Sequence, residues 1–220
     1  MVEAVIFDMD GVIIDSEPFH KKVNYEIYKK LGFHVSEEEY GTFIGVSNKL
    51  MWAYLKDKHS LSQQVDELVQ MQRNGNMEYL LTSDEKPIAG LIPLLQSLEE
   101  NGITMAVASS SPINSIELVL EKFGIKDYFK VVVSGDFVTK GKPDPEIFLH
   151  TSRLLGIHPG NCAVIEDSTH GVKAAKAAEM KCIGFQNLNS GNQDLSAADM
   201  KVDSLEELDF NVIKRLYEAG

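Results

Sequence analysis

Cysteine is scarce in this chain of 220 residues, which holds only Cys162 and Cys182. Two cysteines are too few for a disulfide framework, and they do not have the spacing of a metal site. We therefore expect both to fill space in the core. Basic residues are also in deficit, with 21 Lys and Arg against 33 Asp and Glu and a formal net charge of −12. Because phosphate backbones are bound by basic surfaces, nucleic acid is not an expected partner.

Long apolar runs are missing as well. No stretch approaches the about 20 apolar residues that span a bilayer, so no membrane association is expected. The first residues become a strand too early for a signal peptide, which favours the cytoplasm. The composition is 44% hydrophobic and 25% charged, as in ordinary globular proteins. We expect the chain to act as a monomer.

Short apolar blocks alternate with helical patterns at the start of the chain and from Ile88 onward. Such alternation predicts a parallel sheet with helices on both faces. The expected strands lie at residues 5–7, 103–108, 131–133, 162–165 and 182–185, the last being the final strand. The expected helices lie at residues 92–101, 112–123, 145–155 and 171–178.

Residues 16–82 show helical spacing only. Ser16-Glu17-Pro18 is typical of a helix start, and apolar residues then recur every fourth position from Phe19 to Leu31 before Gly32. Helical spacing returns over residues 50–55 and 65–81. This segment is predicted to be an all-helical insert, with residues 1–15 and 83–220 forming the core.

Four of the expected strands lead into polar, reactive residues. Asp8 and Asp10 follow the first strand, and Ser109-Ser110-Ser111 follow the second. The loop after the third carries Lys142, and the fourth ends at Glu166-Asp167. Because ligands bind outside the carboxyl ends of parallel strands, these groups are expected to meet at one edge of the sheet.

Phosphoryl transfer needs this combination of groups. An aspartate can attack phosphorus and form an acyl phosphate that water hydrolyses, a role that suits Asp8. Asp10 is the expected general acid and base. Ser109 is expected to donate a hydrogen bond to the phosphate, and Lys142 to supply positive charge. The acids that would hold Mg²⁺ are Asp8, Asp10, Glu166 and Asp167, since this ion prefers oxygen ligands.

Each residue also has a purely structural alternative. The acids after Phe7 could form a turn, Ser111 could cap the helix after Pro112, and Glu166-Asp167 could cap the helix before Gly171. Lysines in loops like that of Lys142 are usually solvated. The four structural alternatives would have to hold at four strand ends together, which favours the catalytic interpretation.

With these residues in hand, the sequence resembles the haloacid dehalogenase-like hydrolase superfamily. The matches to its four motifs are Asp8-Met9-Asp10-Gly11-Val12, Ser109 after a strand, Gly141-Lys142-Pro143-Asp144-Pro145, and Glu166-Asp167-Ser168. The resemblance implies an α/β fold with a Rossmann-like, doubly wound, mainly parallel sheet, and a helical cap over the site. Members that break carbon–halogen bonds lack the second aspartate. Asp10 is present here, which implies phosphate-ester chemistry.

Within that family the chain looks like the β-phosphoglucomutases and related sugar-phosphate phosphatases. The substrate-binding positions implied are His20, Gly45, Ser47, Lys49, Arg73, Ser110 and Asn114. Mutases carry a lysine and an arginine around the Gly-Val-Ser motif, where this chain has Ile44 and Asn48. Without those cations a bisphosphate loses charge-assisted contacts of about 1.5–3 kcal/mol each.

Three functions follow as hypotheses. The leading one is a Mg²⁺-dependent phosphatase of small phosphorylated metabolites, in particular sugar phosphates. The second is a β-phosphoglucomutase on the same scaffold. The third is a non-catalytic module that binds a phosphorylated ligand, which would be expected to have lost at least one catalytic position.

Overall fold

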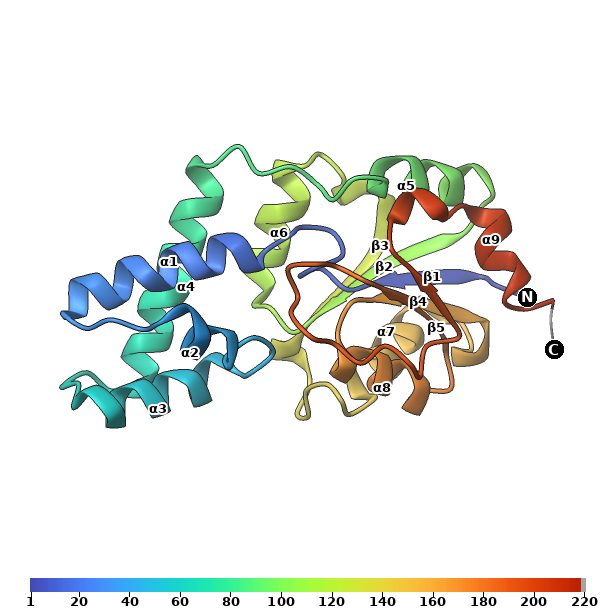
Figure 1. Ribbon diagram of the computed structural model, residues 1–220. Coiled ribbons are helices and arrows are strands. Elements are labelled where there is room, and N and C mark those ends of the chain that lie inside the picture. Colours follow the sequence, from blue (N-terminus) through green and yellow to red (C-terminus); the bar gives the residue numbers. More distant parts are fainter. Residues whose placement is uncertain (219–220) are drawn as a thin grey trace. The chain divides into compact units, whose positions relative to one another are not determined.

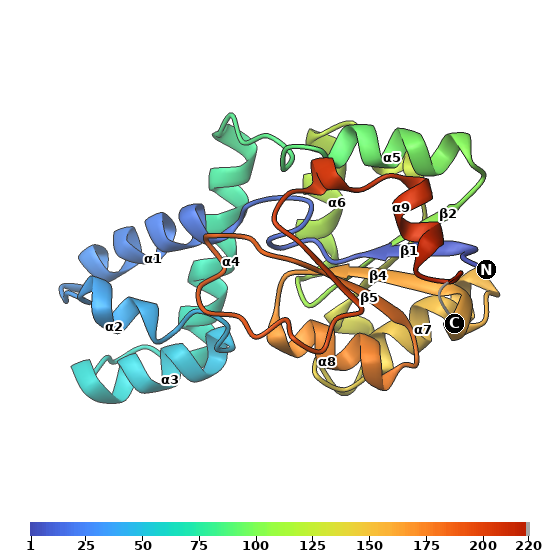
Figure 2. The ribbon, with the colours of Figure 1, turned by 45° about the vertical axis from the view of Figure 1, so that its right-hand side comes forward.

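A computed structural model describes residues 1–218, which form two compact units. One unit comprises residues 1–15 and 86–220, of which the last two are not described, and the other comprises residues 16–85. Figures 1 and 2 show the sheet of the first unit and the helices of the second. Within residues 1–218, none of the helices combines the length and hydropathy that crossing a bilayer requires.

The core unit is built on six parallel strands in the order β3-β2-β1-β4-β5-β6. The strands are β1 (Ala4–Phe7), β2 (Thr104–Ser109), β3 (Phe129–Ser134), β4 (Cys162–Glu166), β5 (Lys181–Phe185) and β6 (Met200–Val202). The helices of this unit are α5 (Leu91–Glu100), α6 (Ile113–Lys122), α7 (Glu146–Leu155), α8 (Thr169–Ala177) and α9 (Phe210–Arg215). The predicted doubly wound α/β core is therefore confirmed.

Both faces of the sheet are covered, which explains why its strands are continuously apolar. Every residue of β1 is buried, and so are nearly all residues of β2, β4 and β5. In Figure 1, α5 and α9 lie on one side of the sheet, and α7 and α8 lie on the other. On the second side, Ile6 and Val164 belong to one buried cluster with Phe148 of α7 and Val172 of α8. Cys162 and Cys182 are free thiols buried in that same cluster, as expected.

One expectation for the core is wrong. The strand at residues 182–185 is not the last, because β6 pairs in parallel with β5 and α9 follows it. The sequence Met200-Lys201-Val202 gives little sign of a strand, since only Val202 is buried. Pairing with β5, not an apolar pattern, is what makes this segment extended.

The second unit is all-helical, as predicted. Its helices are α1 (Glu17–Leu31), α2 (Glu37–Gly41), α3 (Asn48–His59) and α4 (Val65–Thr82). Proline lies in the first turn of α1, and Gly32 ends that helix in the left-handed conformation at φ 81°. The short α2 was not expected; the Ser36 hydroxyl caps it by accepting a hydrogen bond from the Glu39 N–H. The helices enclose their own core around Tyr28, Trp52 and Leu68.

Candidate active site

The carboxyl ends of β1, β2 and β4 lie side by side because the three strands pair in register. Phe7 is opposite Val107 of β2 and opposite Ile165 of β4. The Asp8 N–H extends the ladder by donating to the Ile165 carbonyl at 3.0 Å. The residues that directly follow Phe7 and Ile165, Asp8 and Glu166, therefore come together at one edge of the sheet.

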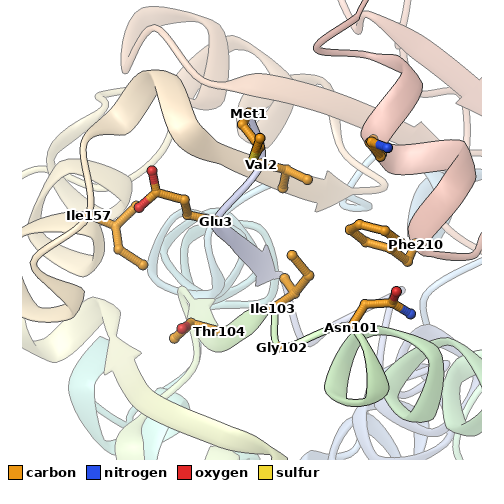
Figure 3. Close-up of a pocket in the computed structure, with 10 residues that line it drawn as sticks. Met1, Val2, Glu3, Asn101, Gly102, Ile103, Thr104, Ile157 and Phe210 are labelled. Atoms are coloured by element: carbon orange, nitrogen blue, oxygen red, sulfur yellow. The ribbon is translucent and has the colours of Figure 1, made fainter.

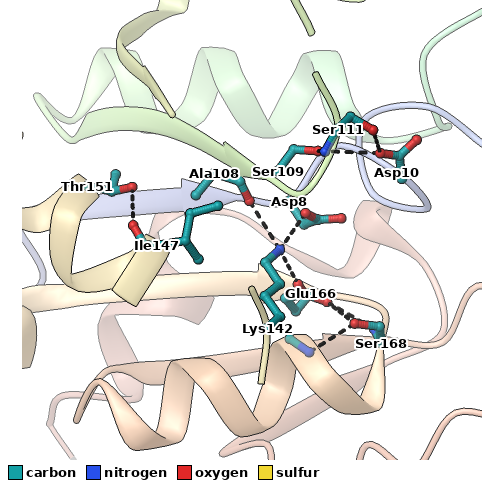
Figure 4. Close-up of polar contacts among 11 residues, drawn as sticks. Asp8, Asp10, Ala108, Ser109, Ser111, Lys142, Ile147, Thr151, Glu166 and Ser168 are labelled. Carbon is teal, nitrogen blue, oxygen red and sulfur yellow. Dashed lines mark hydrogen bonds and ion pairs between the residues drawn. The ribbon is translucent and has the colours of Figure 1, made fainter. Parts of the chain in front are cut away.

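Lys142 reaches this edge from the loop between β3 and α7. Its Nζ lies 2.6 Å from Asp8 Oδ1 and 2.6 Å from Glu166 Oε1, and it donates to the Ala108 carbonyl at 3.1 Å (Figure 4). The Lys142 side chain is only 7% exposed. Burial lowers the pKa of Lys142, but the charges of Asp8 and Glu166 outweigh burial and hold it above its ordinary value. The alternative of a solvated loop lysine is excluded.

Asp8, Glu166 and Asp167 form a buried acid cluster. Each offers one carboxylate oxygen, and these oxygens lie within 4.8 Å of one another. Burial is the main cause that raises the pKa of Asp8 to about 7, with Lys142 opposing it and Glu166 and Asp10 adding to it. Burial and the charges of Glu166 and Asp8 raise the pKa of Asp167 as well. One lysine cannot neutralise three carboxylates, so the cluster has the charge and the donor atoms for a divalent cation.

Two glycines make room for this cluster. A Cβ on Gly11 would lie 1.8 Å from Asp167 Oδ2, and a Cβ on Gly171 would lie 1.7 Å from Glu166 Oε1. Gly11 also has a φ of +82°, a backbone conformation that residues with a side chain rarely adopt. Any larger residue at either position would displace a carboxylate of the acid cluster.

Asp10 is directed to a pair of serines instead of the acid cluster. Its Oδ2 accepts a hydrogen bond from the Ser111 hydroxyl at 2.6 Å and a weaker one from the Ser109 hydroxyl at 3.4 Å (Figure 4). The Ser111 N–H donates to Ser109 Oγ at 3.0 Å. The expectation that Ser111 caps the following helix is wrong: Pro112 is the N-cap of α6, and no side chain caps it. The assignment of Asp10 as a metal ligand stays a prediction.

Two serines to which sequence analysis assigned no role, Ser168 and Ser134, hold these groups in place. The Ser168 N–H and hydroxyl both donate to Glu166 Oε2, at 3.0 and 2.9 Å. Ser168, and not Glu166 or Asp167, caps α8. The buried Ser134 hydroxyl donates to the Ser111 carbonyl at 2.7 Å. Ser134 directly follows the third expected strand, at residues 131–133, so its position at a strand end is the signal that could have found it.

The loop that carries Lys142 is fastened by Glu146 in the first turn of α7. Its carboxylate accepts hydrogen bonds from the Thr139 N–H, the Thr139 hydroxyl and the Lys140 N–H, at 3.0, 2.8 and 2.9 Å. These bonds lower the pKa of Glu146. Glu146 thus ties residues 139 and 140 to the start of α7. Residues 139–146, which include Lys142, form a compact loop as a result.

The predicted substrate-binding residues lie on both units. Ser110 and Asn114 are exposed on the core unit, next to the Ser109–Ser111 turn and in the first turn of α6. The others belong to the helical unit: His20 packs edge-on against Phe19, Gly45 has φ 80°, Ser47 caps α3, Lys49 lies 3.3 Å from Asp66, and Arg73 is exposed on α4. Their contact with substrate stays a prediction.

A separate hollow lies at the amino ends of the strands. It has a volume of about 370 Å³, and its lining includes Glu3, Ile103, Phe210 and Lys214 (Figure 3). These residues precede or begin strands, or lie on α9, whereas the acid cluster lies at the carboxyl ends. The hollow therefore belongs to the other edge of the sheet and contributes nothing to the chemistry of the acid cluster.

The metal-free protein is expected to lose stability as the pH rises from about 4 to about 7. The pKa of Asp8 goes from 3.8 to about 7 on folding, so in this window the folded state keeps a proton that the unfolded state has released. The stabilisation is complete below the lower value and is lost through the upper one, by up to about 1.4 kcal/mol per pH unit. Urea unfolding in EDTA at pH 5 and pH 7 measures the change.

The Asp8→Asn variant is the control for this pH dependence, because it removes the titrating carboxyl group without changing its shape. Its stability should fall less steeply than that of the unaltered protein between pH 5 and pH 7. A midpoint for the unaltered protein that rises over this interval would contradict the prediction.

The fold defines an α/β protein of the doubly wound class. At the carboxyl edge of its sheet, the acid cluster has the charge and the donor atoms for a divalent cation. The chain belongs to the haloacid dehalogenase-like hydrolase family, whose model matches residues 5–185. It is 32% identical over 221 residues to the phosphorylated carbohydrates phosphatase of Thermotoga maritima, covering 98% of this chain and 100% of that protein.

Two further similarities extend over nearly the whole chain. Hexitol phosphatase B of Escherichia coli is 31% identical over 212 residues, with 93% of each chain covered. The crystal structure of β-phosphoglucomutase from Clostridium difficile superposes with a TM-score of 0.81 at 30% identity, covering 100% of this chain and 98% of that one. The predicted resemblance to this subgroup is confirmed.

Proposed function

We propose that the protein is a Mg²⁺-dependent phosphatase of small phosphorylated metabolites, with Asp8 as the nucleophile. The observation that carries the proposal is the buried Asp8 carboxylate, held by Lys142 inside a three-acid cluster at the carboxyl edge of the sheet. The relatives named as phosphatases of hexitol phosphates and of phosphorylated carbohydrates support a sugar phosphate as substrate.

In this mechanism an Asp8 oxygen attacks the phosphorus atom of the ester. Lys142 binds Oδ1 of Asp8, so Oδ2 is assigned to the attack. The bond from phosphorus to the ester oxygen breaks, and Asp10 gives its proton to the departing alkoxide. Water then attacks the phosphorus of the aspartyl phosphate, Asp10 takes up the proton from that water, and the breaking bond returns Asp8 as a carboxylate.

The other residues of the edge stabilise charge. Ser109 would donate to a phosphate oxygen, and Lys142 opposes the negative charge that Asp8 and the phosphoryl group bring together. Asp8, Glu166 and Asp167 have the oxygen donors that suit Mg²⁺, which would supply Lewis-acid stabilisation of the phosphoryl oxygens. Asp10 remains a predicted further ligand of Mg²⁺.

The helical unit is proposed as a cap that excludes water and selects the substrate. The residues proposed to contact the sugar phosphate are His20, Gly45, Ser47, Lys49 and Arg73. We propose that the chain passes from one unit to the other near residues 15–16 and again near residues 82–86.

The second candidate is a β-phosphoglucomutase, favoured by the similarity to the Clostridium difficile enzyme. A mutase must hold a bisphosphate at both ends, and this chain has Ile44 and Asn48 where mutases have cations. Hydrolysis is therefore the better-supported reaction.

A panel of phosphorylated sugars, polyols and nucleotides with MgCl₂ tests the proposal. Phosphate release from at least one sugar phosphate, abolished by EDTA and restored by MgCl₂, is the expected result. Conversion of β-glucose 1-phosphate to the 6-phosphate that outpaces phosphate release would reverse the order of the two candidates. Ligand binding without turnover across the panel would favour the non-catalytic alternative.

The Asp10→Asn variant is expected to lose about 10²–10⁴-fold in kcat/KM for an alkyl phosphate, because it can no longer deliver a proton to the leaving group. The loss in kcat/KM should shrink for substrates with acidic leaving groups, such as p-nitrophenyl phosphate, which depart without protonation. A comparison of kcat/KM for p-nitrophenyl phosphate and for an alkyl phosphate measures this difference, because kcat/KM does not include hydrolysis of the aspartyl phosphate, which is common to both esters. Equal losses for the two esters would contradict the assignment of Asp10 as the general acid.

A further inference from the structure

The loop between β5 and β6 brings a fifth strand end to the acid cluster. Within it, the Ser190 hydroxyl donates a hydrogen bond to Oδ2 of Asp167, and the two groups lie very close. The same Oδ2 atom occupies the space that a side chain at position 11 would fill, and this space is open because residue 11 is a glycine. Asp167 is thus confined between a glycine on one side and a hydroxyl donor on the other.

The loop is anchored to the β1 side of the site, independently of Asp167. Asn187 is buried and donates from Nδ2 to the Gly11 carbonyl at 3.0 Å. The Asn187 Oδ1 atom accepts from the Asn189 N–H at 2.9 Å, and Asn189 Nδ2 lies 2.5 Å from Asp15 Oδ2. The loop therefore fixes Gly11 as well as the serine.

A second anchor ties the loop to the start of α8. Gln193 donates from Nε2 to the Ser190 carbonyl at 2.7 Å and accepts from the Thr169 N–H at 2.9 Å. The Thr169 hydroxyl accepts from the Asp194 N–H at 2.7 Å. Thr169 follows Asp167 by two residues. The hydrogen bonds of Gln193 therefore hold Ser190 in place relative to Asp167.

We propose that Ser190 is a positioning residue for cation binding, which holds the Asp167 carboxylate in the orientation that the acid cluster needs. Residues that orient metal-binding carboxylates by hydrogen bonds typically change metal affinity 10–100-fold when they are removed. Without the hydroxyl, Asp167 keeps its charge but gains freedom to rotate. The inference rests on the proposed metal site and deepens it.

Thermal unfolding at stepped MgCl₂ concentrations tests the role without measuring catalysis, because a ligand of the folded state raises Tm as its concentration passes Kd. The full-length Ser190→Ala variant is expected to need at least about 10-fold more MgCl₂ for the same rise in Tm. Ser190→Thr, which keeps the hydroxyl, should follow the unaltered protein. Ser196→Ala removes an exposed serine of the same segment and is the matched control.

Steady-state kinetics separate positioning from a general loss of folding. For Ser190→Ala, the MgCl₂ concentration at half-maximal rate should rise by the same factor, while kcat at saturating MgCl₂ stays within about 3-fold of the unaltered value.

The proposal is overturned if Ser190→Ala and the unaltered protein respond to the same MgCl₂ concentration, or if neither responds. If Ser190→Ala is shifted but no variant hydrolyses any phosphate ester, the positioning role stands and the proposed phosphatase function fails.

Discussion

Replacement of Asp8 by asparagine is expected to abolish phosphatase activity, with kcat lowered by at least about 10⁴-fold. The amide has the shape of the carboxylate but cannot form the acyl phosphate on which the mechanism depends. Folding should not suffer, because the change removes one negative charge from a buried cluster with three acids and one lysine. Phosphate release with MgCl₂, and Tm of the same preparations, measure the two effects.

Asp127→Asn is the matched control, since Asp127 is exposed in the short turn before β3. It should keep full activity. Acid-quenched enzyme should carry phosphate covalently bound in the unaltered protein and none in Asp8→Asn. Substantial turnover by Asp8→Asn would remove the nucleophilic role and the mechanism with it.

Replacement of Lys142 by methionine is expected to have the largest effect on stability. The change removes the cation that lies between Asp8 and Glu166, both of which are buried. Removing one partner of a buried ion pair typically costs about 3–5 kcal/mol, because the remaining charge has no compensation. The cost should be smaller at pH 5 than at pH 7, since protonation of Asp8, whose pKa burial already raises, relieves it.

Urea unfolding in EDTA at both pH values measures this free energy. Lys140→Met is the control, because Lys140 is exposed and its contact with Asp144, at 3.7 Å, is a surface ion pair worth less than about 1 kcal/mol. Activity of Lys142→Met should fall about 10²–10³-fold as the charge opposite the phosphoryl group is lost. An unfolding midpoint equal to that of Lys140→Met would show that Lys142 does not balance the two acids.

Much of the core could be predicted because its signals are local. Val5-Ile6-Phe7 and Cys162 to Ile165 are apolar blocks of strand length, and each ends where polar chemistry begins. Helix boundaries were also marked locally, as by Gly32 and Gly156, which both end helices in the left-handed conformation. The segment Met200–Val202 carried no such signal, because its extended form comes from pairing with β5.

The partners of Asp10 could not be predicted. Local sequence marks the end of the first strand and the breaker at Gly11, but it does not show what Asp10 contacts. Its carboxylate accepts hydrogen bonds from Ser109 and Ser111, which are about a hundred residues further along the chain. A partner so distant leaves no trace in the local pattern.

The sequence by itself determined which chemical groups stand at the ends of which strands, because apolar runs, breakers and charges are properties of neighbouring residues. Only the tertiary structure decided which groups contact one another: Asp8 and Glu166 bind Lys142, Asp10 accepts hydrogen bonds from two serines, and Ser190 contacts Asp167. The physical reason is that hydrogen bonds and ion pairs of this kind act over about 3 Å in space, whereas their partners are separated by tens of residues in the chain.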